Sequence, residues 1–204
     1  MKRTIAFLAL YLFGFIPVEA QKDNLKKNYV VDTVASEVLW FCGQHYGCIS
    51  LDTGSIEVVK DKIVGGSFII DLNTVEDDDI TDNMLLRLTL NNVIKSLSFF
   101  NVETFPHSKF RIEEVEKIDS DYYRVSGILE IHDVVRDINF FSKIIFENER
   151  IIVESEIINI DRTNWGVNYL SQKFDPEGKE TMYVPDTISL KVHLFADKIK
   201  KKKK

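Results

Sequence analysis

The stretch that decides the fold runs from Tyr122 to Phe146 and reads YYRVSGILEIHDVVRDINFFSKIIF. Alternate residues of its first half are apolar, and this period of two predicts a strand with one dry face and one wet face. The polar segment from His132 to Asp137 interrupts the alternation, and apolar residues then return from Ile138 onward. Two strands around a short polar loop predict an antiparallel hairpin.

The second strand of this hairpin is apolar on both faces. Ile138, Phe140 and Ile144 share one parity, whereas Phe141 and Ile145 share the other. Because successive side chains of a strand point to opposite sides, both sides of this strand need cover. The hairpin therefore predicts a sheet that encloses an apolar interior.

The same alternation recurs along the rest of the chain, and it predicts about eight antiparallel strands. Lys60 to Lys62 is a polar turn, and Gly54 breaks one strand as a bulge would. Apolar residues at helical spacing predict one inserted α-helix over about residues 82–97, with Thr81 or Asp82 as its N-cap. The fold class is all-β, a barrel or a sandwich, and an eight-stranded barrel is just wide enough for its own side chains or for one slender ligand.

The two ends of the chain differ in composition from the middle. Residues 1–20 combine a basic start, a short apolar run and a small-residue cleavage site, and they predict a cleaved signal peptide. Residues 21–27 are expected to be a flexible segment, residues 28–196 the barrel domain, and residues 197–204 a basic disordered tail. A signal peptide predicts a periplasmic or secreted protein.

Cys42 and Cys48 flank the loop Gly-Gln-His-Tyr-Gly. In an exported protein such a pair is a disulfide candidate that would close a small loop. Two buried thiols in a strand–loop–strand unit explain the pair equally well, because the geometry that a disulfide needs cannot be read from spacing.

Residue types that carry chemistry are present but scattered. The four histidines lie on separate predicted elements without metal-ligand spacing, and the acidic run from Glu76 to Asp79 lacks the pattern of a calcium loop. No nucleophile elbow, phosphate loop or dinucleotide fingerprint occurs. The net charge of −6 disfavours nucleic acid as a partner. The sequence therefore predicts a protein that is not an enzyme and has no metal or cofactor.

Four ordered segments resemble the YceI-like family of lipid- or polyisoprenoid-binding domains with a lipocalin-like barrel. They are YVVD at 29–32 with SEVLW at 36–40, FFNVETFP at 99–106 with Phe110, VSGILEIHDVVR at 125–136, and IDRTNWG at 160–166. The resemblance spans about residues 28–196. It implies an eight-stranded lipocalin-like barrel whose interior holds a long isoprenoid or fatty chain.

The resemblance and the strand parities together give a set of candidate ligand-binding residues. They are Trp40, His45, Phe68, Ile70, Phe110, Leu129, Ile131, Phe140 and Trp165. Ordinary core packing would place most of these side chains inward as well. His45, Asp161 and Arg162 are the polar candidates for contacting a head group, although Asp161 and Arg162 also suit a structural role in the turn at Trp165 and Gly166.

The function that these observations favour is an exported protein that binds a polyisoprenoid, an isoprenoid quinone or a fatty-acyl chain for transport, storage or sequestration. The alternative is a solidly packed barrel that serves as a structural or interaction module of the cell envelope. The C-terminal lysines, from Lys198 onward, either form a solvated tail or contact an anionic membrane, and a second copy of the chain is another candidate partner besides the apolar ligand.

Overall fold

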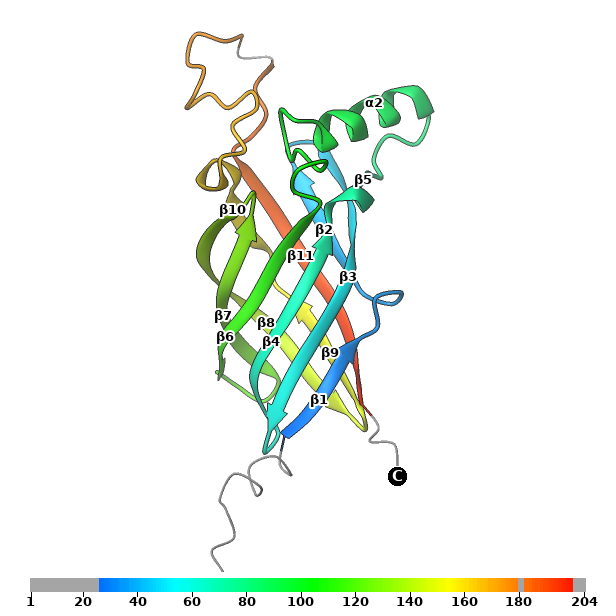
Figure 1. The fold of residues 1–204 in the computed structure, drawn as a ribbon, viewed down its shortest axis with the longest axis vertical. Coiled ribbons are helices and arrows are strands. Elements are labelled where there is room, and N and C mark those ends of the chain that lie inside the picture. The colour runs from blue at the N-terminus through cyan, green and yellow to red at the C-terminus, as the bar shows by residue number, and fades with distance from the viewer. Residues whose placement is uncertain (1–25, 180–181, 200–204) are drawn as a thin grey trace, which may run out of the picture.

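The computed structural model describes residues 26–179 and 182–199. Eight long strands form a closed antiparallel ring in the order β2-β3-β4-β6-β7-β8-β9-β11, and β11 pairs with both β9 and β2. Figure 1 shows this barrel standing upright, with helix α2 at its upper end. The predicted all-β class, the eight-stranded antiparallel barrel and the inserted helix are confirmed.

The strands of the ring are β2 (Glu37–Cys42), β3 (His45–Val59), β4 (Lys62–Asp71), β6 (His107–Lys117), β7 (Tyr122–Ile131), β8 (Val134–Glu147), β9 (Arg150–Ser155) and β11 (Thr187–Lys198). Three further strands attach to it: β1 (Lys26–Val31), β5 (Glu76–Asp77) and β10 (Ile158–Asp161). The remaining elements are the 3-10 turns η1 (Leu72–Thr74) and η2 (Arg162–Trp165) and the helix α2 (Met84–Lys95).

The hairpin that decides the fold is β7–β8, and its loop is shorter than the sequence predicts. Only His132 and Asp133 form the turn, both with positive φ, whereas residues 134–137 already belong to β8. Two residues in the left-handed region make the tight turn that fits the twist of a hairpin. On β8, Phe140 faces inward, and on the outer face Tyr122 stacks on Phe141 with ring centroids 5.3 Å apart.

A bulge in β3 keeps its apolar residues inside the barrel. The β3–β4 register shifts between Leu51 and Thr53, slightly earlier than the position suggested by Gly54. Leu51 and Ile56 are both buried although they have opposite parity. The extra residue in the bulge therefore reverses which side chains of β3 point inward, so that the apolar ones after the bulge face the core.

Helix α2 begins two residues later and ends two residues earlier than predicted, and its N-cap is Asn83 rather than Thr81 or Asp82. The Asn83 side chain accepts a hydrogen bond from the backbone N–H of Leu86 at 3.0 Å, as an N-cap does. Of its twelve residues only Asn91 and Ile94 are buried. None of the helices in the described part of the chain combines the length and apolar character needed to span a bilayer.

The barrel extends beyond the domain boundaries that the sequence predicts. Lys26 and Lys27, expected in a flexible segment, belong to β1 and pair with β3. Asp197 and Lys198, expected in the tail, belong to β11 and pair with β1. These two pairings share β1, which explains why both ends are ordered together. The predicted signal peptide and residues 200–204 of the predicted tail lie outside the described residues.

Substitution of Gly47 tests the contact between β3 and β5. A Cβ atom on Gly47 would lie 1.8 Å from the carbonyl oxygen of Glu76, so Gly47→Ala must push β5 away. We expect a loss of about 2 kcal/mol in the free energy of unfolding, measured by urea denaturation. The control is Gly65→Ala, where the nearest atom would be Glu57 Oε2 at 3.5 Å. Equal stability of the two variants would contradict this close approach.

Candidate ligand cavity inside the barrel

The interior of the barrel is hollow. A cavity of about 730 Å³ lies inside it, within the range of about 300–1,000 Å³ that is usual for small-molecule sites. Its wall is almost entirely aliphatic and aromatic and is formed by residues of all eight ring strands. This cavity disagrees with the alternative prediction, a barrel whose interior is solidly packed with side chains.

The cavity reaches the α2 end of the barrel, where its wall is formed by a helix, a turn and a loop segment as well as by strands. Leu90, Val93 and Ile94 of α2 contribute side chains there, together with the β2–β3 turn and the segment before β11. At the opposite end, Val58 and Ile151 of a second core cluster are fully buried and do not line the cavity. The helix thus covers the one end at which the cavity is not closed by packed strand residues.

Eight of the nine predicted ligand-binding residues line this cavity. They are Trp40, His45, Phe68, Ile70, Phe110, Leu129, Ile131 and Phe140. Their role as ligand contacts stays a prediction, since the same inward parity follows from core packing. The sequence did not predict the wall residues that come from α2 and from the segment before β11. The positions of these segments depend on long loops, whose residues show no hydrophobic periodicity.

Trp165 is not part of the cavity wall. Its side chain is buried in the core cluster at the α2 end, and its indole N–H donates to the carbonyl oxygen of Leu129 at 3.1 Å. Trp40 makes a similar bond to the carbonyl oxygen of Glu76, also at 3.1 Å, but its ring does line the cavity. A buried indole N–H needs an acceptor. The bond from Trp165 therefore holds η2 against the barrel, and the bond from Trp40 holds β5 against it.

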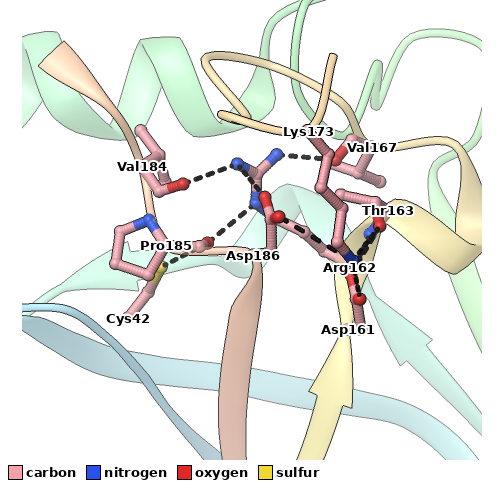
Figure 2. A network of polar contacts seen from close by, with 9 residues as sticks. All are labelled: Cys42, Asp161, Arg162, Thr163, Val167, Lys173, Val184, Pro185 and Asp186. Atoms are coloured by element: carbon pink, nitrogen blue, oxygen red, sulfur yellow. Dashed lines mark hydrogen bonds and ion pairs between the residues drawn. The ribbon is translucent and has the colours of Figure 1, made fainter. Parts of the chain in front are cut away.

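Arg162 holds the loops at the α2 end of the barrel together (Figure 2). Its guanidinium is almost fully buried and donates to three backbone carbonyl oxygens, those of Pro185 at 3.0 Å, Val167 at 2.6 Å and Val184 at 2.9 Å. Asp186 lies 3.5 Å away as its nearest carboxylate. Burial lowers the pKa of Arg162 from its ordinary value, and Asp186 opposes this effect. The group nevertheless remains a cation, as arginine does in proteins.

Asp161 caps the turn that carries Arg162. Its carboxylate accepts from the backbone N–H of Thr163 at 3.0 Å and from the Thr163 hydroxyl at 2.6 Å, and it pairs with Lys173. Burial opposes ionisation, but the bonds from Lys173 and Thr163 prevail and lower the pKa of Asp161. Asp161 and Arg162 thus hold the turn before Gly166, which is the structural role that the sequence had left open.

His45 lies at the rim of the cavity and faces two carboxylates that the sequence did not connect with it. Its Nδ1 atom is 3.2 Å from Asp79 Oδ2 and 3.5 Å from Asp77 Oδ2. The acids lie more than thirty positions further along the chain. They reach His45 because β5 pairs with β3, placing Asp77 opposite Gly47. Only the acidic run itself could have pointed to them in the sequence.

Cys42 and Cys48 are both free thiols in the structure, so the disulfide candidate is not formed. In the β2–β3 register Cys42 pairs with His45, whereas Cys48 pairs with Leu39, three positions away. Cys42 lines the cavity, but Cys48 does not. Burial raises the pKa of both thiols. Forming a bridge would require the hairpin to change its register.

These features define a class of protein: a closed antiparallel barrel with a large apolar cavity and a helix across one end. Comparison with known families places the chain within it, since residues 29–196 match the YceI-like domain. The chain belongs to the YceI-like domain family. No curated protein matches the sequence significantly.

Solved structures show the same fold at low sequence identity. The BcnA protein of Burkholderia cenocepacia is 16% identical with a TM-score of 0.64, and the match covers 81% of this chain and 98% of that one. A polyisoprenoid-binding domain from Saccharophagus degradans is 15% identical with a TM-score of 0.59, covering 83% and 97%. The YceI protein of Campylobacter jejuni is 20% identical with a TM-score of 0.52, covering 69% and 75%.

Replacing Arg162 tests its structural role at the α2 end. Arg162→Met removes a buried guanidinium that donates to three carbonyl oxygens, and we expect the free energy of unfolding to fall by about 3 kcal/mol. Chemical denaturation measures this loss. The matched control is Lys173→Met, which removes an exposed cation from the same network and should cost less than about 1 kcal/mol. A similar small loss in both variants would show that the guanidinium does not hold these loops.

Proposed function

We propose that this protein is an exported carrier that holds one long apolar chain in its barrel for transport, storage or sequestration. The ligand classes that suit the site are a polyisoprenoid, an isoprenoid quinone and a fatty-acyl chain. The carrier acts by binding alone and needs no catalytic group. The observation that carries the proposal is the apolar cavity of about 730 Å³ in a barrel of the YceI-like family.

The energetics of burial support a ligand of this kind. Transfer of a methylene group from water to an apolar site is favourable by about 0.8 kcal/mol. A long chain that fills the cavity can therefore bind tightly with few polar contacts. The structural relative from Saccharophagus degradans is described as a polyisoprenoid-binding domain, which agrees with the same chemistry.

Export to the periplasm or out of the cell is the second part of the proposal, and it rests on the signal-like composition of residues 1–20. A membrane contact through the C-terminal lysines and a homodimer remain predictions. The C-terminal end of β11 (Thr187–Lys198) lies at the end of the barrel opposite α2 (Figure 1). A membrane held by the tail would therefore face the packed end of the barrel, away from the cavity rim.

Native mass spectrometry of the protein, purified gently from its own host, tests the proposal directly. We expect a bound species whose mass, after extraction, identifies a prenyl or acyl compound. The protein should also take up a long polyprenol, an isoprenoid quinone or palmitate when it is refolded without lipid. A bare chain that refuses all three compounds would contradict the proposal.

A substitution that narrows the cavity tests where the ligand binds. Val192 lines the cavity on β11, and Val192→Phe should weaken binding of the identified compound by about tenfold or more, because the larger ring occupies ligand space. The matched control is Val64→Phe on the outer face of β4, where the side chain is exposed. Equal affinities of the two variants would place the ligand outside the barrel.

A further inference from the structure

His45, Asp77 and Asp79 each direct one potential ligand atom toward a common point at the α2 end of the barrel. These atoms all lie within 4.8 Å of one another. His45 begins β3, Asp77 ends β5, and Asp79 follows β5 by two residues. Among the residues that the structure describes, no other group of three histidine, cysteine or acidic side chains meets in this way.

One oxygen of Asp77 has no hydrogen-bond donor although the side chain is completely buried. Its Oδ1 accepts from the backbone N–H of Ile80 at 3.0 Å, but Oδ2 is without a hydrogen-bond partner. That oxygen points toward His45 Nδ1, at 3.5 Å. A separation of this size is too long for a strong hydrogen bond. A buried carboxylate oxygen without a donor is costly, so it calls for a proton or a cation.

Asp79 supplies the second carboxylate of the cluster. Asp79 accepts at Oδ1 from the backbone N–H of Tyr46 at 3.2 Å, and its Oδ1 and Oδ2 lie 3.3 and 3.2 Å from His45 Nδ1. Two carboxylates and one imidazole therefore bring one potential ligand atom each to the same point.

We propose that His45, Asp77 and Asp79 form a binding site for a divalent cation, and that Zn²⁺ is the ion it fits best. In tetrahedral zinc sites the ligand bonds measure about 2.0–2.1 Å, which places neighbouring ligand atoms about 3.3 Å apart. Two of the three distances between ligand atoms, from His45 Nδ1 to the carboxylate oxygens at 3.2 and 3.5 Å, bracket this value, and the two carboxylate oxygens lie within 4.8 Å of each other.

The donor set also separates Zn²⁺ from other common cations. One imidazole nitrogen and two carboxylate oxygens are a three-ligand set that leaves a fourth tetrahedral position open. Ca²⁺ takes six to eight oxygen ligands and Mg²⁺ an octahedral oxygen shell, and neither is matched by a site with three protein donors of which one is nitrogen.

The surrounding structure holds these ligands in place before any ion arrives. The backbone N–H of Asp77 donates to Asn91 Oδ1 on α2 at 2.9 Å, and Asn91 is itself buried. The β3–β5 pairing fixes Asp77 and Glu76 against Gly47 and Cys48. Because a pre-formed ligand set loses little conformational entropy on binding, this rigidity favours affinity.

Isothermal titration of tag-free, chelator-treated mature protein with ZnCl₂ tests the site. We expect one Zn²⁺ per chain and a rise in melting temperature on adding the ion. Asp77→Asn should weaken Zn²⁺ binding by roughly 100-fold or more, because even outer-shell substitutions cost 10–100-fold. The asparagine keeps the Oδ1 acceptor for Ile80, so the variant should fold, and without metal its melting temperature should be equal to or above that of the original protein.

Matched controls separate this site from loose metal binding at the surface. Asp78→Asn removes an exposed carboxylate between the two ligands, and His107→Ala removes an exposed histidine of β6. Both should bind Zn²⁺ as the original protein does, whereas His45→Ala should not. The proposal is overturned if the original protein gains no stability from Zn²⁺, or if the controls lose as much affinity as Asp77→Asn. Neither outcome bears on the lipid carrier, because these titrations contain no lipid.

Discussion

The pairing of β9 with β11 is the constraint on which the rest of the molecule depends. The two strands run antiparallel from His193 opposite Glu154 to Asp197 opposite Arg150, and Arg150 donates to both carboxylate oxygens of Asp197 at 2.8 and 2.7 Å. This contact turns an eight-stranded sheet into a ring, which removes its open edges. Closure with eight strands also fixes the diameter. The cavity is therefore a property of the closed ring and not of any single side chain.

The two ends of this ring are closed by different means. At one end β1 spans between β11 and β3, and buried residues such as Val58 and Ile151 fill the interior. At the other end a helix, a turn and a loop meet, and only Asn91 and Ile94 of α2 are buried. An element with few buried contacts opens at a lower free-energy cost than a packed strand. The α2 end is thus the side from which a ligand can enter with the least disruption of the barrel.

The sequence predicted the barrel well because alternation along a strand depends only on neighbouring residues. It placed Leu129, Ile131 and Phe140 on the inner wall for this reason. Trp165, a predicted ligand-binding residue, lies outside the wall, since its position depends on a tertiary hydrogen bond to Leu129 that no local pattern encodes. The cluster of His45 with Asp77 and Asp79 was missed for the same kind of reason, because it arises only when β5 pairs with β3.

Arg162 and Asp77, two charged groups near the rim of the cavity, differ in how many of their polar atoms have hydrogen-bond partners. This difference separates a structural role from a functional one. A guanidinium has five N–H donors, and Arg162 directs its donors to Pro185, Val167 and Val184 with Asp186 alongside. The guanidinium therefore has few free N–H donors for a ligand head group, and its role is to stabilise the loops around it. Asp77 is the opposite case, since it is fully buried but keeps one oxygen without a hydrogen bond. Asp77 is one of five described residues with a buried side-chain atom that lacks a hydrogen-bond partner, and it is the one that also meets two other potential metal ligands.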